Sequence, residues 1–434
     1  MRDGKRMAAA ERHTVAVIIT ALRKSGNTLL RRLLLARGSM LSAQVCDRPA
    51  VEVTAMEIGV WWVFLNRHAG WILTTGLAFV LVRNARKWRG DRARAARLRA
   101  APAQPVVLTT MPLLSVLVAA WNEAHTIAAH IQSFDQLSYA DKELLICAGG
   151  EDGTYQVALE HAGTDVVVLE QLPGEGKQRA LQRCWERARG ELIYLTDADC
   201  LVTDETMLRI VAPLVEEEEY VCTGTCKPRS GQQDRPFVIY QWAVDLYRAA
   251  KRGRHVPAVL GANWCVHRES LEAVGGFDTD DPIGEDYLLS ILLRRAGYRI
   301  RYVPDSVCET AYSDTFLQHS QRLSRWLRNS FLHGRAYGDR VRVRNVLRMW
   351  ATGLGGFLLL PSSVLLGRIA VVAWLLLAAS SLAAGLRCLA FARLLGVTVP
   401  PLTFVQLPVF LLVDWLCAAR ALVELAVPSR RWRW

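Results

Sequence analysis

Short apolar runs recur along the middle of the chain, and each one stops at a polar or glycine-containing turn. Four of them cover residues 114–119, 144–147, 166–169 and 192–195. Apolar runs of this length, bounded by turn residues, are typical of strands buried in a parallel sheet. Helical patterns lie between them, as in residues 177–189. This alternation predicts an α/β fold with a Rossmann-like, mostly parallel sheet, which we assign to residues 112–313.

A long apolar stretch precedes this domain. Residues 56–83 are mainly apolar, with a polar triplet at Asn66, Arg67 and His68. Because an α-helix needs about 20 apolar residues to cross a bilayer, we predict a transmembrane helix there, although an arginine near mid-helix is costly to insert. The next residues, 84–111, form a linker rich in arginine. A basic block beside a span marks its cytosolic side.

The C-terminal part of the chain is almost wholly apolar. Residues 347–427 predict two or three transmembrane segments, near 349–367, 369–386 and 404–425. Only Arg368 separates the first two segments, which is too little for a hairpin, so one of them could be a broken piece kinked at Pro361. The pattern therefore predicts an integral protein of the plasma membrane with its α/β domain in the cytosol.

Residues 314–346 connect the two parts with an amphipathic pattern. One helical face is apolar and another is basic, with Phe316, Leu323, Leu327 and Phe331 on the first and Arg322, Arg325 and Arg328 on the second. This pattern predicts a helix lying in the membrane interface. A surface helix on a globular domain would show the same pattern.

Composition supports a protein with separate polar and apolar parts. Hydrophobic residues make up 51%, charged residues 22%, and the net charge is +12. Arginines cluster beside the apolar stretches, which indicates membrane lipids as partners, and no nucleic-acid motif competes. The ten cysteines lack the paired spacing of a zinc site and are interpreted as reduced thiols. Residues 1–55, as a surface helix or disordered segment, and the basic tail 428–434 add no motif.

The apolar run at 192–195 ends at two carboxylates, Asp197 and Asp199, separated by one alanine. In open α/β sheets ligands bind at the carboxyl edge, and paired hard oxygens suit a divalent cation that itself holds phosphates. An isolated Asp-x-Asp is more often a polar β-turn. The neighbouring motifs therefore decide between the two interpretations.

Several further motifs accompany this pair in a fixed order. They are Asn122-Glu123 after the first strand, Lys177 at a helix start, Gly261 and Asn263 in a glycine-rich turn, Glu285-Asp286 at a helix start, and Arg325-Trp326 on the amphipathic helix. A lysine and free amides at a helix start favour a phosphate. The acids at a helix start could instead only stabilise the helix dipole.

Together these motifs resemble the processive-type family 2 glycosyltransferases, the membrane-bound GT-A enzymes that include cellulose, chitin and hyaluronan synthases. The resemblance covers roughly residues 112–335. It implies that Asp197 and Asp199 bind Mg²⁺ or Mn²⁺ together with the diphosphate of a sugar nucleotide, and that Asp286 is the general base. It also implies that Arg325 contacts the diphosphate and that Trp326 lies beneath the acceptor sugar.

The chain departs from the family pattern at two places. The acidic element that binds uridine, usually DDGSxD, here reads CAGGED. Cys147 and Ala148 replace its leading aspartates, while Glu151 and Asp152 remain. The glutamine expected at position 322 stands one place earlier. The first departure concerns nucleotide recognition, and the second concerns processive synthesis.

The chemistry of sugar transfer needs these residue types in its own right. A divalent cation and basic side chains neutralise the departing nucleoside diphosphate, while a base takes the acceptor proton. One base without a second nucleophile predicts inversion. We assign donor binding to Asn122, Glu123, Glu151, Asp152, Lys177, Asp197 and Arg325, and acceptor binding to Trp326, Glu285, Gly261 and Asn263.

The sequence therefore predicts an inverting hexosyltransferase that moves a sugar from a nucleotide donor, a UDP-sugar, to a saccharide or lipid-linked acceptor in polysaccharide synthesis. Two alternatives remain open. One is a single-transfer enzyme that makes a glycolipid. The other is a non-enzymatic membrane scaffold with a decayed nucleotide site, for which CAGGED is the best support.

Overall fold

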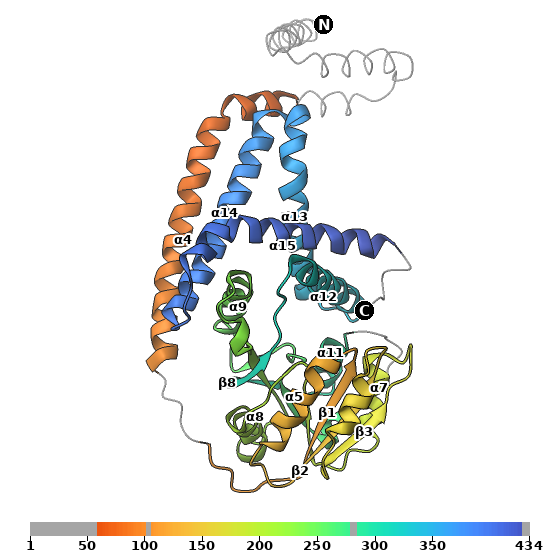
Figure 1. Cartoon of the computed structure of the whole chain (residues 1–434). Helices are drawn as coiled ribbons and strands as arrows, with labels where there is room; N and C mark the ends of the chain where they lie inside the picture. Colours follow the sequence, from red (N-terminus) through yellow and green to blue (C-terminus); the bar gives the residue numbers. More distant parts are fainter. Residues whose placement is uncertain (1–58, 101–105, 278–283, 428–434) are drawn as a thin grey trace, which may run out of the picture. The chain divides into compact units, whose positions relative to one another are not determined.

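The computed structural model describes residues 59–100, 106–277 and 284–427 (Figure 1). The predicted N-terminal segment 1–55 and the basic tail 428–434 lie outside the described residues. Contacts divide the chain into two compact units, Met1–Val82 with Gly355–Ala379, and Arg83–Leu354 with Ser380–Trp434.

An eight-stranded sheet forms the centre of the larger unit, with the order β3-β2-β1-β4-β7-β5-β8-β6. Its strands are β1 (Leu114–Trp121), β2 (Lys142–Gly149), β3 (Val166–Glu170), β4 (Leu192–Leu195), β5 (Val221–Pro228), β6 (His255–Val256), β7 (Trp264–His267) and β8 (Ile300–Thr310). Strands β1 to β4 pair in parallel, as do β5 and β8, whereas β7 and β6 run antiparallel to their neighbours. The predicted mostly parallel α/β fold is confirmed.

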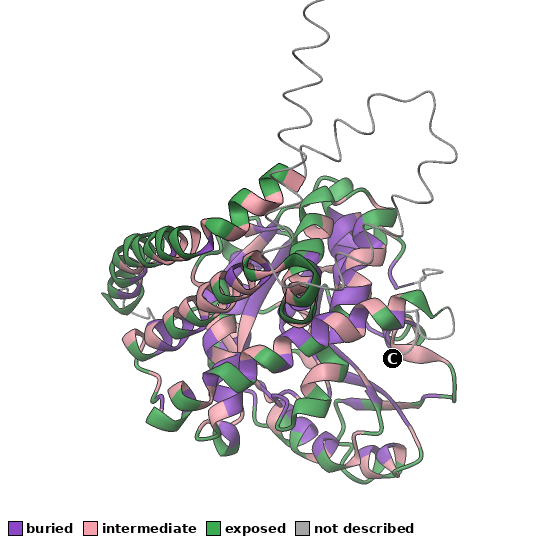
Figure 2. Cartoon of the chain, turned by 90° about the horizontal axis from the view of Figure 1, so that it is seen from above, coloured by how far each residue is buried: buried purple, intermediate pink, exposed green. Residues whose placement is uncertain are grey.

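Helices cover both faces of this sheet. Successive strand residues point to opposite faces, so Val116 packs in one core with α5 (Ala124–Asp135), α6 (Thr154–Glu160) and α8 (Asp204–Glu216). Leu117 packs in the other with α7 (Gly176–Trp185), α10 (Arg268–Glu272) and α11 (Glu285–Arg295). In Figure 2 the strands are largely coloured as buried, while the helices carry exposed residues on one side. Burial on both faces explains the unbroken apolar runs of the strands.

A helical layer adjoins the sheet in the same unit. Helix α9 (Pro236–Ala249), helix α12 (Phe316–Ala336) and helix α15 (Pro401–Ala426) share aromatic contacts, among them Phe237 with Phe410 at 5.1 Å between ring centroids. The start of α12 is fixed by a capping box between Thr315 and Gln318. The apolar face predicted for this helix is therefore partly covered by other helices.

Three described helices are long and apolar enough to cross a membrane: α13 (Arg340–Leu366), α14 (Arg368–Leu394) and α15. Helix α13 continues through Pro361. The break between α13 and α14 is a tight turn at Gly367, whose φ of +70° suits glycine, and a Cβ there would lie 2.5 Å from Asn66 Oδ1. Asn66 donates to the Leu366 carbonyl and accepts from the Ile369 amide. A side chain from a separate helix thus closes a turn that looked too short from sequence.

The N-terminal helix differs from the predicted linker. Residues 59–67 are helical, and α4 (Ala69–Ala100) runs on through the arginine-rich part of 84–111. Alanine and arginine are good helix formers, and no proline interrupts this segment. Helix α4 is not among the described helices that meet the membrane criterion, so the transmembrane helix at 56–83 stays a prediction.

Candidate active site

The two carboxylates of the Asp-x-Asp motif lie directly beyond β4, at the carboxyl edge of the sheet. The turn is closed by a hydrogen bond from the Cys200 amide to the Asp197 carbonyl, 3.0 Å. Asp197 and Asp199 each offer a carboxylate oxygen, and these oxygens lie within 4.8 Å of one another and of the Cys200 sulfur. The Cys200 thiol donates to Asp199 Oδ1 at 3.6 Å, which leaves the oxygens as the hard donors. This donor set fits Mg²⁺ or Mn²⁺.

Lys177 connects this motif to another one. It is the second residue of α7, and its Nζ lies 2.7 Å from Asp197 Oδ1 and 2.6 Å from Glu285 Oε1. Burial disfavours the ammonium, but the two carboxylates outweigh burial and raise the pKa of Lys177 well above its ordinary value. Lys177 in turn outweighs burial at Asp197 and lowers the pKa of that carboxyl. Among the residues that the structure describes, Asp199 forms no ion pair with a lysine or arginine, and burial together with Asp197 raises its pKa.

Asp286 follows Glu285 in the first turn of α11. Gly284 precedes this helix as its N-cap, with a φ of +81°, and Asp286 Oδ1 accepts from the Tyr287 amide at 2.7 Å. Burial, followed by the neighbouring Glu285, raises the pKa of Asp286 to about 6. Gly261 lies against this carboxyl, because a Cβ at that position would be 3.1 Å from Asp286 Oδ2. The predicted acceptor residue Gly261 therefore provides space for the Asp286 carboxylate.

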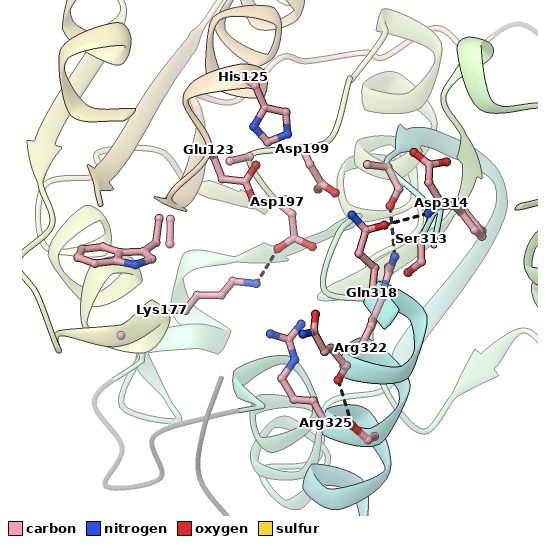
Figure 3. Close-up of a pocket in the computed structure, with 18 of the residues that line it drawn as sticks. Glu123, His125, Lys177, Asp197, Asp199, Ser313, Asp314, Gln318, Arg322 and Arg325 are labelled. Carbon is pink, nitrogen blue, oxygen red and sulfur yellow. Dashed lines mark hydrogen bonds and ion pairs between the residues drawn. The ribbon is translucent and has the colours of Figure 1, made fainter. Parts of the chain in front are cut away.

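Basic side chains from α12 complete the site. A pocket of about 1220 Å³ is lined on one side by Asp197, Asp199 and Lys177 and on the other by Arg322 and Arg325. Figure 3 shows Lys177 joined to Asp197, with the two arginines on the α12 side of the pocket. Arg322 donates to the Ala311 carbonyl at 3.2 Å, which holds its side chain along the pocket wall. The pocket thus combines a carboxylate edge with a cationic wall.

Five of the predicted site residues line this pocket: Glu123, Lys177, Asp197, Asp199 and Arg325. Three others build the turns beside it. Asn122 adopts a positive φ of 58° and accepts from the Glu151 amide at 2.9 Å. Asp152 accepts from the Ala124 amide at 3.0 Å, and its other oxygen binds Thr154. The side chains of Asn122 and Asp152 therefore tie the ends of β1 and β2 together.

Two further residues predicted to bind the acceptor do not line the pocket. Asn263 is completely buried, accepts from the Tyr194 hydroxyl at 3.0 Å and donates to the Thr225 and Ser306 carbonyls. Its amide is used in hydrogen bonds inside the sheet, and the structure does not bring Asn263 to the pocket lining. Trp326 is 41% exposed on α12, and the Arg342 guanidinium lies 5.4 Å from its ring. It remains accessible, next to the pocket residue Arg325.

The structure adds pocket residues that the sequence did not identify. Trp121 and Gln171 line the pocket at the ends of β1 and β3. Gln171 is 5% exposed, and its Oε1 has no hydrogen-bond partner among the described residues. Cys147 and Ala148, in contrast, are completely buried, and burial raises the pKa of the Cys147 thiol to about 11. Trp121 is the last residue of β1 and Gln171 directly follows β3, so their positions at the carboxyl ends of strands were the available signal in the sequence.

The far end of the pocket lies between α12 and α15. Arg328, Arg420 and Glu424 line it, and Glu424 accepts from Arg328 at 2.9 Å and from Arg420 at 2.6 Å. Arg420 also donates to the Ser320 hydroxyl at 3.2 Å. These polar contacts join α12, which carries Arg325, to a candidate membrane helix.

Comparison with known proteins agrees with this geometry. The Glycosyltransferase like family 2 model matches residues 112–329. The chain is 23% identical to the Bacillus subtilis (strain 168) protein named Probable glycosyltransferase YdaM, over 63% of this chain and 65% of that one. It is 24% identical to a Staphylococcus epidermidis poly-beta-1,6-N-acetyl-D-glucosamine synthase, over 49% of this chain and 53% of that one. The chain therefore spans between about half and two thirds of the length of these relatives.

A solved structure also aligns with this chain. The mannosyltransferase PcManGT from Pyrobaculum calidifontis, in complex with GDP-Man and Mn²⁺, is 20% identical and has a TM-score of 0.49, covering 80% of this chain and 99% of that one. The family match rests instead on residues 112–329, which are half of the 434 residues and contain the sheet, Lys177, Asp286 and most of α12. The chain belongs to the family 2 glycosyltransferases, with the GT-A type of α/β fold.

Proposed function

We propose that the protein is an inverting glycosyltransferase that moves a sugar from a UDP-sugar to a saccharide or lipid-linked acceptor at the cytosolic face of the plasma membrane. The observation that carries this proposal is the double contact of Lys177 with Asp197 and Glu285. It links the candidate metal-binding carboxylates of the pocket to the first turn of α11, which carries the candidate base Asp286. The double ion pair of Lys177 is not expected in a scaffold whose nucleotide site has decayed.

The donor diphosphate is assigned to the pocket edge between β4 and α12. Asp197 and Asp199 would hold Mg²⁺ or Mn²⁺, which when bound neutralises charge on the departing diphosphate. Arg325 and Arg322 face these carboxylates and would bind phosphate oxygens, since guanidinium groups match phosphate geometry. Burial, followed by the neighbouring Arg322, lowers the pKa of Arg325, and an incoming phosphate would relieve this repulsion.

Trp121 and Gln171 are our candidates for nucleobase recognition. The acidic residues that read uridine in similar enzymes are replaced by buried Cys147 and Ala148, which expose no polar atom to the pocket. Trp121 is 38% exposed and offers a ring face for stacking. Gln171, whose Oε1 has no hydrogen-bond partner in the described part of the chain, would accept the imide N–H of uracil. Trp121 and Gln171 would therefore make the contacts to the nucleobase that the CAGGED segment cannot make.

Asp286 is the proposed general base. A carboxyl with a pKa of about 6 is mostly ionised at neutral pH, yet basic enough to accept the proton of an attacking hydroxyl. We assign Asp197 and Asp199 to the metal and Glu285 to its ion pair with Lys177, which leaves Asp286 as the single acid assigned to the acceptor hydroxyl. A single displacement by the acceptor hydroxyl then inverts the anomeric centre. Trp326, exposed beside this site, would support the acceptor ring.

The long apolar helices support the proposed membrane setting. Three helices are long and apolar enough to span a bilayer, and arginines crowd α4 beyond Val82. The positive-inside rule places such a basic segment, and the domain that follows it, on the cytosolic side. The Staphylococcus epidermidis relative is named as a synthase of an N-acetyl-D-glucosamine polymer, which supports a UDP-linked hexosamine as the first donor to test.

A panel of UDP- and GDP-sugars, incubated with the full chain in nanodiscs and Mn²⁺, tests the proposal through nucleotide release. We expect release of UDP from at least one UDP-sugar, and none after chelation of the metal or in the Asp199→Asn protein. Calorimetry with UDP and Mn²⁺ is the second readout. No release with any donor, together with no metal-dependent heat, would identify a scaffold. Product length from radiolabelled donor separates a polymerase from a single-transfer enzyme.

A further inference from the structure

Three basic side chains converge at a site away from the pocket, between α4, α9 and α14. The Nζ of Lys251 lies 3.4 Å from the centroid of the Tyr247 ring, and the Cζ of Arg387 lies 5.6 Å from the same centroid. Lys87 lies close enough to Arg387 for the two positive charges to repel each other. We call these residues, with Asp91, the Tyr247 cluster. All of them belong to the larger unit.

Asp91, the carboxylate of the cluster, already has hydrogen-bond and ion-pair partners. Asp91 is 3% exposed, accepts from the Tyr247 hydroxyl at 2.9 Å and lies 3.6 Å from Arg94. Within residues 59–100, 106–277 and 284–427, neither Lys87, Lys251 nor Arg387 forms an ion pair with a carboxylate. Burial, then Arg387 and Arg83, lower the pKa of Lys87. The cluster therefore holds cations that repel one another and that an added anion would stabilise.

Arg387 indicates which anion would neutralise this excess positive charge. Its Nε and Nη1 are buried and have no hydrogen-bond acceptor among the described residues. Leaving buried donors of a charged group unsatisfied is costly. The planar guanidinium is the side chain best matched to two oxygens of one phosphate. Lys87 and Lys251 are exposed beside it and would complete the neutralisation of a phosphate.

The position of Arg387 favours a lipid as the source of that phosphate. It lies about two turns from the end of α14, a helix long and apolar enough to span a membrane. Arginine near a helix end sits at the level of the lipid headgroups. Leu382 and Leu386, on the preceding turn and a half of α14, are 36% and 39% exposed, so apolar surface adjoins the cations. A soluble phosphate ion has no apolar part that could cover this surface, whereas a lipid has acyl chains.

We propose that the Tyr247 cluster binds the phosphate of an anionic membrane lipid. The guanidinium of Arg387 and the ammonium groups of Lys87 and Lys251 contact the phosphate oxygens, while the acyl chains lie along α14. The lipid would thereby add a phosphate contact between α4, α9 and α14, of which α9 and α14 already pack in one core. This site is independent of the sugar-transfer proposal.

The test titrates short-chain phosphatidylglycerol into the detergent-solubilised full chain and counts bound lipid by native mass spectrometry, with thermal unfolding as a second readout. We expect saturable binding that raises the midpoint of unfolding. The double variant Lys87→Gln/Lys251→Gln changes only exposed residues and should weaken binding by roughly tenfold or more, as should Arg387→Gln. The matched control, Arg187→Gln/Arg299→Gln, removes the same charge elsewhere and should bind as the wild type does.

Two further arms identify the ligand. Phosphatidylcholine, whose phosphate is already paired with a cation, should bind more weakly than phosphatidylglycerol, and inorganic phosphate should neither bind saturably nor displace the lipid. Equal phosphatidylglycerol binding by wild type and the Lys87→Gln/Lys251→Gln protein would overturn the site. Saturable binding of inorganic phosphate that displaces the lipid would overturn the lipid as its ligand.

Discussion

The Lys177 ammonium lies 2.7 Å from the Asp197 carboxylate, across the pocket edge that β4 and α7 form together. The same ammonium lies 2.6 Å from Glu285, the neighbour of Asp286. One cation is therefore shared between the carboxylates assigned to the metal and the acids at the start of α11. Its removal should affect both groups at once.

Lys177→Gln should move the pH dependence of transfer. Lys177 lowers the pKa of Asp286, so its loss should raise that pKa further above its ordinary value. The acid limb of the kcat/KM profile should shift to higher pH. Arg179→Gln, which changes an exposed residue of the same helix, is the control and should keep the wild-type profile. Identical limbs in wild type and Lys177→Gln would show that Lys177 does not influence the base.

The wild-type profile is itself a prediction. A base must be ionised to accept a proton, and the pKa of Asp286 is raised to about 6. Below that pH the carboxyl is protonated, so kcat/KM should fall by roughly tenfold per pH unit, and above it the rate should level off. Initial rates at low donor concentration, between about pH 5 and 8, measure this limb. A limb near pH 4 would mean that an unperturbed carboxyl controls the reaction.

Asp199→Asn should abolish metal-dependent donor binding while preserving the fold. The substitution keeps the shape of the side chain but removes one of the two carboxylates that face each other beyond β4. Calorimetry with UDP should then give the same small heat with and without Mn²⁺. Asp305→Asn, an exposed carboxyl that pairs with Arg209 outside the pocket, is the control. Retained Mn²⁺-dependent heat in Asp199→Asn would remove Asp199 from the metal site.

Gln171→Leu should weaken binding of the nucleotide without changing the chemical step. It removes the buried acceptor that we assign to the nucleobase, and one such hydrogen bond corresponds to about a tenfold rise in KM for the UDP-sugar. The value of kcat should stay close to that of the wild type. Leu172→Ala alters the exposed neighbour and serves as the control. If KM is unchanged in Gln171→Leu, another group reads the base.

Much of the sheet was predictable because its strands are buried on both faces. The run at 192–195 coincides with β4, and the helix start at Lys177 lies one residue inside α7. Strand β7 was missed, because residues 264–267 follow a glycine-rich turn and pair antiparallel, without the helix that marks a parallel strand. Local pattern cannot distinguish such a strand from a loop.

The site was predictable in its motifs but not in its contacts. Asp197 and Lys177 were each assigned to the donor, yet the sequence could not show that Lys177 also reaches Glu285. Asn263 in a glycine-rich turn looked like a ligand contact, whereas tertiary hydrogen bonds consume its amide. Arg322, which the sequence placed on the basic face of an interface helix, lines the pocket. In each case the contacts of the residue depend on where its side chain points in the folded protein, which the sequence pattern does not show.

The most direct measurement is made on the Asp286→Asn protein, with UDP binding by calorimetry and sugar transfer recorded on the same preparation. The substitution keeps the shape of the side chain but removes the proton acceptor. We expect nearly unchanged Mn²⁺-dependent UDP binding, with sugar transfer reduced roughly 10²–10⁴-fold. Asp305→Asn should retain both activities. Full transfer by Asp286→Asn would contradict the assignment of Asp286 as the base and, with it, the proposed mechanism.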